Sequence, residues 1–192
     1  MDDRKDFTFD KNSLRRILKE RRSSITDKPE FDAIITARVK ELVCGSVMAY
    51  VSIGSEISTD RLIKELLMRD DVTLYVPLTV SDTITPVRLI SYNGEKADRL
   101  GNLPERCYEC SYVNDGTKNL PIKLDYCITP LLGFNADGYR IGYGKGCYDK
   151  FFSRTDTVKI GLAYENLSVR FTPDCNDIPL DCCVTEKKVI YF

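Results

Sequence analysis

The sequence predicts a three-layer α/β/α domain with a mostly parallel central sheet, and two observations support this prediction. Short apolar segments that suit buried strands alternate with longer segments that suit helices. One such alternation, with a strand at 46–51, a helix at 59–68 and a strand at 72–76, forms a β-α-β unit. A right-handed crossover of this kind makes the two strands parallel. A chain of 192 residues fits one domain with a sizeable core, so residues 1–192 are expected to form a single domain.

The other elements are predicted from capping residues and apolar periodicity. A first helix is expected from Phe7 to Arg22 with Asp10 as its N-cap. A second helix is expected to start at Asp27–Glu30, where Pro29 suits the first turn, and to end near Cys44. The polar stretch 91–119 indicates a long irregular connection. The remaining predicted elements are strands at 84–90, 124–129, 159–163, 182–185 and 189–191 and a helix at 148–154.

The balance of charge argues against nucleic acid or membrane partners. The formal net charge is −1, although charged residues make up 30% of the chain. No apolar run reaches the length of a membrane-spanning helix. The first six residues are too acidic and polar for a secretory signal, so a cytoplasmic protein is expected. We expect a monomer or a weak homo-oligomer.

Cysteine and histidine usage restricts the chemistry. The chain has eight cysteines, mostly in apolar stretches, as expected for reduced thiols that pack as small hydrophobic groups. Cys107 and Cys110 form a lone Cys-x-x-Cys, which lacks the second pair or the histidines of a zinc site and is predicted to be inert. Because the chain has no histidine, an imidazole base is excluded. Carboxylates, lysine, tyrosine or groups of the substrate must carry acid–base chemistry.

A glycine-rich stretch at 130–149 carries the strongest functional signal. Four of the 11 glycines fall within nine residues of it, just before the predicted helix at 148–154: Gly138, Gly142, Gly144 and Gly146. Free backbone N–H groups ahead of a helix bind anions, and Arg140 and Lys145 add positive charge. This predicts a phosphate-binding loop, with a flexible surface loop as the alternative. The spacing matches neither a P-loop nor a dinucleotide fingerprint, so the residues alone indicate only a phosphorylated ligand.

The same stretch closely resembles the signature of the 5-formyltetrahydrofolate cyclo-ligase family. That signature reads Pro-x-x-x-Phe-Asp, two spacers, and Gly-x-Arg-Leu-Gly-x-Gly-x-Gly-Tyr-Tyr-Asp, and it is long and specific. Three residues depart from the family pattern. Asn135 replaces an aspartate, Cys147 replaces the first tyrosine, and Asn176 replaces a histidine. The resemblance covers nearly all of the chain and implies the family's α/β fold.

The predicted first helix carries a basic stripe. Lys11, Arg15, Lys19 and Arg22 recur at helical spacing, and by themselves they would suit a solvated face. The resemblance changes this interpretation for two of them. Family members open with a basic-x-x-Leu-Arg helix whose cations reach ATP, which implies that Lys11 and Arg15 bind ATP. Lys19 and Arg22 are still expected on the surface.

Glu56 follows the first predicted strand, on the edge where open α/β sheets bind ligands. It could instead cap the next helix. The resemblance implies that Glu56 holds the folate and that Val51 forms an apolar wall beside it.

The resemblance implies an ATP- and Mg²⁺-dependent ligase that converts 5-formyltetrahydrofolate to 5,10-methenyltetrahydrofolate, with release of ADP and phosphate. The formyl oxygen would be phosphorylated, and ring closure would then expel phosphate. A non-catalytic nucleotide- or folate-binding protein on the same fold is the alternative. Asp149 could also be a simple helix N-cap. The implied roles are catalysis by Arg140, Lys145 and Tyr148, ATP binding by Lys11, Arg15, Arg140, Gly142, Gly144, Lys145 and Gly146, folate binding by Val51, Glu56 and Tyr148, and Mg²⁺ binding by Asp149 and Asp177.

Overall fold

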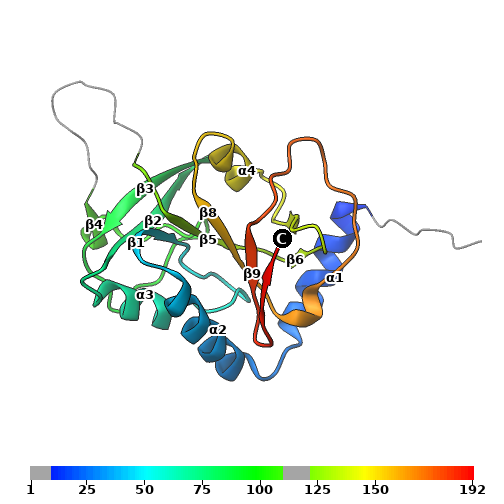
Figure 1. Ribbon diagram of the computed structural model, residues 1–192, viewed down its shortest axis with the longest axis horizontal. Helices are drawn as coiled ribbons and strands as arrows, with labels where there is room; N and C mark the ends of the chain where they lie inside the picture. The colour runs from blue at the N-terminus through cyan, green and yellow to red at the C-terminus, as the bar shows by residue number, and fades with distance from the viewer. Residues whose placement is uncertain (1–9, 110–121) are drawn as a thin grey trace, which may run out of the picture.

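A computed structural model describes residues 10–109 and 122–192 of the protein (Figure 1). Its helices are α1 (Lys11–Ser23), α2 (Lys28–Leu42), α3 (Asp60–Leu67) and α4 (Cys147–Phe152), with 3-10 turns η1 (Glu105–Cys107) and η2 (Glu165–Leu167). Its strands are β1 (Gly45–Ala49), β2 (Val72–Val80), β3 (Thr83–Leu89), β4 (Tyr108–Glu109), β5 (Tyr126–Pro130), β6 (Gly133–Phe134), β7 (Arg140–Ile141), β8 (Val158–Leu162), β9 (Cys182–Val184) and β10 (Val189–Tyr191).

The central sheet has eight strands in the order β10-β9-β8-β5-β1-β2-β3-β4. The five strands from β9 to β2 pair in parallel, and the pairs β9–β10, β2–β3 and β3–β4 are antiparallel. The predicted β-α-β unit is confirmed, because β1 pairs with β2 in parallel across α3. Parallel strands need crossovers, and these bring the loops after β1 and β5 to the same edge of the sheet.

Side chains of β1 alternate between two cores, which shows that both faces of the sheet are covered. Val47 and Ala49 pack in the larger core with residues of α1, α2 and α3. Met48 points to the other face and packs with Phe151 and Phe152 of α4. Figure 1 shows α4 on one side of the sheet and α2 and α3 on the other. This arrangement confirms the predicted three-layer α/β/α fold.

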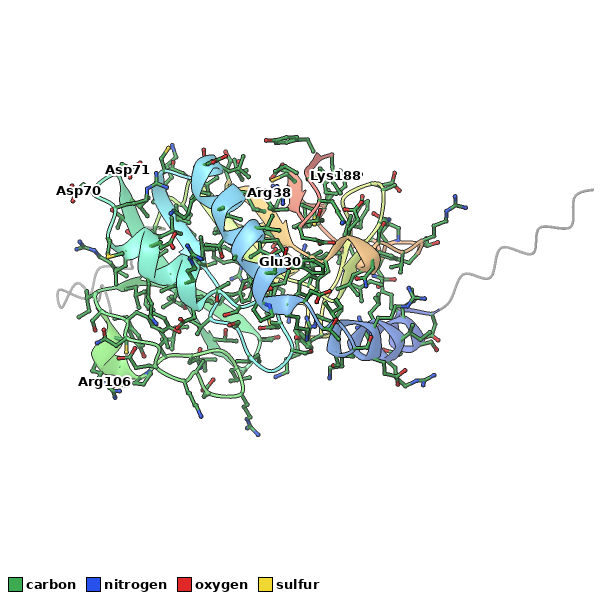
Figure 2. All side chains as sticks on the ribbon, turned by 90° about the horizontal axis from the view of Figure 1, so that it is seen from below. Glu30, Arg38, Asp70, Asp71, Arg106 and Lys188 are labelled. Carbon is green, nitrogen blue, oxygen red and sulfur yellow. The ribbon has the colours of Figure 1, made fainter. Side chains whose placement is uncertain are left out.

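Helices α2 and α3 lie side by side on the larger core (Figure 2). Arg38 of α2 ties this layer to the turn after β9, where its guanidinium donates to the carbonyl oxygens of Thr185 (3.0 Å), Glu186 (2.7 Å) and Lys187 (3.1 Å). Figure 2 shows Arg38 close to the nearby Lys188. Within residues 10–109 and 122–192, no helix is long and apolar enough to cross a membrane.

The start of the first helix is set by Asp10, as predicted. The Asp10 Oδ1 atom accepts hydrogen bonds from the backbone N–H groups of Asn12 (2.8 Å) and Ser13 (3.2 Å). The predicted start at Phe7 lies outside the described residues. The N-cap satisfies two of the amide groups that an α-helix leaves without a partner, so it fixes where the basic face of α1 begins.

The structure differs from the prediction mainly in very short strands. The region 91–119, predicted as irregular, contains η1 and β4 up to residue 109, while residues 110–119 lie outside the described part. Strands β6 and β7 form a separate two-stranded hairpin that was not predicted. A strand of two residues is too short to show alternation of apolar and polar side chains. The hairpin matters because it carries Arg140.

Candidate active site

A cavity of about 410 Å³ lies where α1, the loop after β1, the end of β2, residues 99–101, the glycine loop and residues 174–177 meet. All twelve residues that were predicted to contact ATP, folate or Mg²⁺ line this cavity. They are Lys11, Arg15, Val51, Glu56, Arg140, Gly142, Gly144, Lys145, Gly146, Tyr148, Asp149 and Asp177. The fold therefore brings the predicted site together from segments far apart in the sequence.

Helix α1 lies against the glycine loop. The Arg15 Nε atom donates to the carbonyl oxygen of Gly142 at 3.0 Å, and its Nη1 atom donates to Asn12 Oδ1 at 2.6 Å. Farther along, α1 packs against the β6–β7 hairpin (Figure 1), where a Cβ on Gly133 would lie 2.8 Å from the Leu18 side chain. The missing side chain of Gly133 thus permits the close approach that seats α1 beside the loop.

Two glycines of the loop need the conformational freedom of glycine. Gly144 has φ +98° and Gly146 has φ +67°, which L-residues rarely adopt. Gly138 also has a positive φ, but it packs against Phe192, so it is structural and does not line the cavity. Lys145 is exposed between the two cavity glycines and has no hydrogen-bond or ion-pair partner among the described residues. Its ammonium group is therefore available to an anionic ligand.

Arg140 is held rigidly at the cavity wall. Its side chain is 5% exposed, and its Nη2 atom donates to Asp149 Oδ1 at 2.9 Å. Its Nη1 atom donates to the carbonyl oxygen of Ile178 at 2.8 Å, and its guanidinium lies 5.1 Å from the ring centroid of Phe152. A guanidinium has five N–H donors, so these two contacts leave donor capacity for a ligand.

Asp149 is not the N-cap of α4, so that alternative was wrong. The N-cap is Gly146, and Asp149 lies in the first turn. Its Oδ1 atom accepts from Arg140 and from the backbone N–H of Ile178 at 3.1 Å. Lys11 forms a second charged group with Asp177 and with Asp174, the latter at 2.6 Å. Each of the two predicted Mg²⁺ ligands is therefore paired with a predicted ATP-binding cation.

Glu56 is buried in the loop after β1, where it lines the cavity. Its Oε2 atom accepts from the backbone N–H of Ile53 at 2.8 Å, within its own loop. The N-cap of α3 is Thr59, so Glu56 does not cap that helix. Burial raises the pKa of Glu56, while the Ile53 N–H, the Tyr143 hydroxyl and the Arg22 charge act in the opposite direction. These three neighbours thus favour the ionised carboxylate, against the effect of burial.

Val51 and Tyr148 provide apolar surface near Glu56. Val51 is buried beyond the end of β1, and Tyr148 is half-buried with its ring 6.0 Å from that of Phe152. Burial raises the pKa of Tyr148 well above its ordinary value. Its phenol therefore stays protonated at neutral pH and can donate a hydrogen bond.

Arg22 was predicted to lie on the surface, and this was wrong. It is 2% exposed, and its guanidinium donates to Ser55 Oγ (3.1 Å), to the carbonyl oxygen of Leu131 (3.0 Å) and to the Tyr143 hydroxyl (2.7 Å). Lys19 is exposed as expected, with its ammonium group 5.7 Å from the ring centroid of Tyr143. Arg22 and the exposed Lys19 belong to the same basic stripe, so the helical spacing alone could not have indicated that Arg22 is buried.

Sequence reasoning also missed other residues that line the cavity, among them Arg99, Tyr143 and Asp174. Asp174 could have been found from its spacing, three residues before Asp177 in a polar turn. Arg99 lies in the stretch that was predicted to be irregular, and nothing in the sequence indicated that it lines the cavity. Tyr143 was read only as a spacer between two glycines.

Two departures from the family pattern have structural explanations. The Asn135 Oδ1 atom accepts from the backbone N–H groups of Asp137 (3.1 Å) and Tyr139 (2.9 Å), and so shapes the β6–β7 turn. An aspartate oxygen could accept the same bonds, so the change preserves the turn. Cys147 opens α4 and packs beside the smaller core. Burial raises the pKa of its thiol, so Cys147 is not an activated nucleophile.

The donor set can be tested for Mg²⁺. Among the described residues, no three histidine, cysteine or acidic side chains form a metal-binding group. Mg²⁺, however, usually takes only one or two carboxylates, with phosphate oxygens and water as its other ligands. Asp149 and Asp177 line the same cavity as the glycine loop. This set fits a cation that arrives with a triphosphate rather than an all-protein cage.

The remaining cysteines fit the prediction of structural thiols. Cys107, Cys127, Cys182 and Cys183 are buried, and burial raises the pKa of each thiol. Cys44 and Cys175 are exposed. Cys110 lies outside the described residues, so the Cys107–Cys110 pair stays a prediction.

Comparison with known proteins agrees with this geometry. A profile of the 5-formyltetrahydrofolate cyclo-ligase family matches residues 8–186. A 5-formyltetrahydrofolate cyclo-ligase of Mycoplasma pneumoniae is 26% identical over 189 residues, which cover 93% of this chain and 100% of that protein. A 5-formyltetrahydrofolate cyclo-ligase of Escherichia coli is 28% identical over 155 residues, which cover 75% of this chain and 79% of that protein.

Solved structures show the same fold. A 5,10-methenyltetrahydrofolate synthetase from Mycoplasma pneumoniae superposes with a TM-score of 0.68 at 25% identity, over 93% of this chain and 99% of that one. The structure of a 5,10-methenyltetrahydrofolate synthetase from Aquifex aeolicus superposes with a TM-score of 0.69 at 24% identity, over 94% of this chain and 92% of that one.

Proposed function

The chain belongs to the 5-formyltetrahydrofolate cyclo-ligase family, and we propose that it converts 5-formyltetrahydrofolate and ATP to 5,10-methenyltetrahydrofolate, ADP and phosphate in the presence of Mg²⁺. One observation carries the proposal. A single cavity is lined by the cations of α1, by the glycine loop and by the buried carboxylate of Glu56. That cavity combines a cationic region, suited to a triphosphate, with an apolar region suited to a folate ring.

The triphosphate would bind between α1 and the glycine loop. Lys145 has no partner among the described residues, and Arg140 retains N–H donors that face the cavity. Lys11 and Arg15 would approach from the helix, and backbone N–H groups of the glycine loop would add neutral donors. Phosphoryl transfer depends on such positioning and charge neutralisation.

Mg²⁺ would be held by Asp149 and Asp177 together with phosphate oxygens. When bound, it supplies charge neutralisation on the transferred phosphoryl group. The protein residues act around it. Lys11 and Arg140 pair with these carboxylates, so the residues that would hold the cation also place two positive charges beside the phosphates.

The folate would occupy the region of Val51, Glu56 and Tyr148. An ionised Glu56 accepts hydrogen bonds, and a pterin ring carries N–H donors. Val51 offers an apolar surface, and the protonated Tyr148 offers both a ring face and a donor. These side chains would orient the formyl oxygen toward the phosphates.

The chemical problem is that the formyl oxygen would otherwise leave as hydroxide. Transfer of the γ-phosphoryl group to that oxygen forms an iminium phosphate at N5. Attack by N10 on the same carbon closes the five-membered ring, N10 gives up its proton to solvent, and the phosphate leaves with the oxygen. Arg140 and Lys145 would stabilise the charge on the transferred group, and Tyr148 would keep the reacting edge of the ring in place.

The test is an assay with 5-formyltetrahydrofolate, ATP and Mg²⁺. We expect near-ultraviolet absorbance of the methenyl product to rise together with ADP, in equal amounts. Arg15→Ala should lower the rate, whereas Arg16→Ala, which removes a neighbouring cation with a 72% exposed side chain, should not. Binding of both ligands without product or ADP would support the alternative of a non-catalytic binding protein.

A further inference from the structure

Arg22 is a buried cation that joins three separate segments. Its three hydrogen bonds reach Ser55 in the loop after β1, Leu131 just after β5 and Tyr143 in the glycine loop. A guanidinium is always charged in proteins and is costly to bury without compensation. No ion pair to Arg22 is present among the described residues, but the charge of Glu56 acts on it through space. The compensation for Arg22 is therefore Glu56.

The hydroxyl of Tyr143 lies between these two charges. A guanidinium can only donate hydrogen bonds, so the hydroxyl accepts from Arg22 at 2.7 Å. Its single proton is then left for an acceptor, and the hydroxyl interacts with the Glu56 carboxylate. Arg22 thus donates to Tyr143, and the Tyr143 hydroxyl favours the ionised form of Glu56, which lines the same cavity.

Side chains of helix α1 contact both the glycine loop and the loop that carries Glu56. Lys11 and Arg22 are 11 positions apart in α1, which separates them by about 16 Å along the axis. Lys11 and Arg15 reach the glycine loop and the acidic turn, whereas Arg22 reaches the loop that carries Glu56. Tyr143 stands between Gly142 and Gly144, so it links the phosphate-binding loop to the folate side.

We propose that Arg22 and Tyr143 are positioning residues that hold Glu56 ionised and aimed into the cavity for the folate ring. The proposal rests on the folate-binding role of Glu56 given above. The ring of Tyr143 stays 43% exposed at the cavity, and the cations of Lys19 and Arg22 lie 5.7 Å from its centroid. These contacts and the hydrogen bond from Arg22 hold the Tyr143 side chain at the wall of the cavity that Glu56 also lines.

The groups around Glu56 determine how folate binding should change with pH. The Ile53 N–H, the Tyr143 hydroxyl and the Arg22 charge favour the ionised carboxylate, and burial opposes it. Tyr50 and Tyr148 also face Glu56, and its charge helps to raise the pKa of each phenol. Loss of the Tyr143 hydroxyl should therefore raise the pKa of Glu56 and weaken folate binding first at acidic pH.

The test compares Tyr143→Phe with Tyr139→Phe. The first removes only the hydroxyl from a largely accessible ring, and the second removes a hydroxyl nearby that does not line the cavity. Dissociation constants for 5-formyltetrahydrofolate are measured by calorimetry from pH 5 to 8 without nucleotide, and for Mg-ATP at pH 7. We expect Tyr143→Phe to weaken folate binding about tenfold. The loss of folate affinity at acidic pH should begin at a higher pH than in the wild type, and the affinity for Mg-ATP should stay within twofold of the wild-type value.

A double-mutant cycle separates positioning from a general structural effect. In a Glu56→Gln background the Tyr143→Phe change should have no further effect on folate affinity, because the carboxylate it serves is absent. Arg22→Lys should weaken folate binding in the same pH-dependent way. The melting temperature of this variant is measured as well, to show that it is folded. Additive effects, or an unchanged pH profile in Tyr143→Phe, would overturn the inference while leaving the proposed function standing. A wild-type protein that fails to bind 5-formyltetrahydrofolate would overturn both.

Discussion

Gly144→Ala should destabilise the glycine loop, and the structure gives the size of the effect. A side chain at φ +98° is strained by about 1–2 kcal/mol. Its Cβ would lie 3.2 Å from Arg15 Cζ and displace the guanidinium that donates to Gly142, which costs about 1 kcal/mol at a partly exposed site. Alanine restricts the unfolded chain and returns about 0.5 kcal/mol. The net loss is about 2 kcal/mol, which lowers Tm by roughly 4–8 °C in a chain of this size.

Gly142→Ala is the matched control. Gly142 lines the same cavity but has no positive φ, and a Cβ there would meet no atom within 4 Å. It should therefore melt like the wild type in a circular dichroism scan, whereas Gly144→Ala melts earlier. Both variants should bind Mg-ATP more weakly in calorimetry, because each adds a methyl group where phosphates are proposed to lie. Equal melting temperatures for the two variants would show that a side chain at position 144 does not strain the loop.

The remaining predictions concern charged residues of the cavity. Lys11→Ala and Arg140→Ala should raise the dissociation constant of Mg-ATP about tenfold and change that of folate far less, while Glu56→Ala should do the reverse; equal effects on both ligands would refute this division of the site. ATP with a chelator should bind at least tenfold more weakly than Mg-ATP, because Asp149 and Asp177 then repel its phosphates, and equal affinities would count against their role. Burial raises the pKa of Glu56 above its ordinary 4.5, so its stabilising contribution is complete below pH 4.5 and is lost as pH rises through the folded value. The Tm of Glu56→Gln relative to the wild type should accordingly be higher at pH 7 than at pH 4, and a Tm difference that is the same at both pH values would contradict the assignment.

The main elements of the fold could be predicted because their patterns extend over enough residues. The capping of α1 by Asp10 and the parallel pairing of β1 with β2 follow from local sequence and from chain connectivity. Strands β4, β6 and β7 have two residues each, and their pairing depends on distant segments. No local pattern can indicate such strands.

Site residues that belong to a sequence motif could be predicted, whereas those that reach the site only through tertiary packing could not. The glycine loop and Glu56 were located from spacing and resemblance, and both line the cavity. Arg22 has the same helical periodicity as Arg15, but its burial comes from Leu131 and Ser55, which are 109 and 33 positions away. A basic stripe on a helix does not reveal which of its cations another segment will cover.

The ion pairs of the cavity explain how one surface can suit a polyanion and a divalent cation. Lys11 is paired with Asp174 and Asp177, and Arg140 is paired with Asp149, so each of these cations has a carboxylate partner. A phosphate alone would have to compete with these carboxylates for the cations, and a cation alone would have to compete with the amino and guanidinium groups for the carboxylates. When both arrive together, Lys11 and Arg140 can exchange a carboxylate for a phosphate, and Asp149 and Asp177 can exchange these cations for Mg²⁺. The arrangement therefore favours ATP and Mg²⁺ as a joint ligand, and it gives the acidic residues a role before any reaction begins.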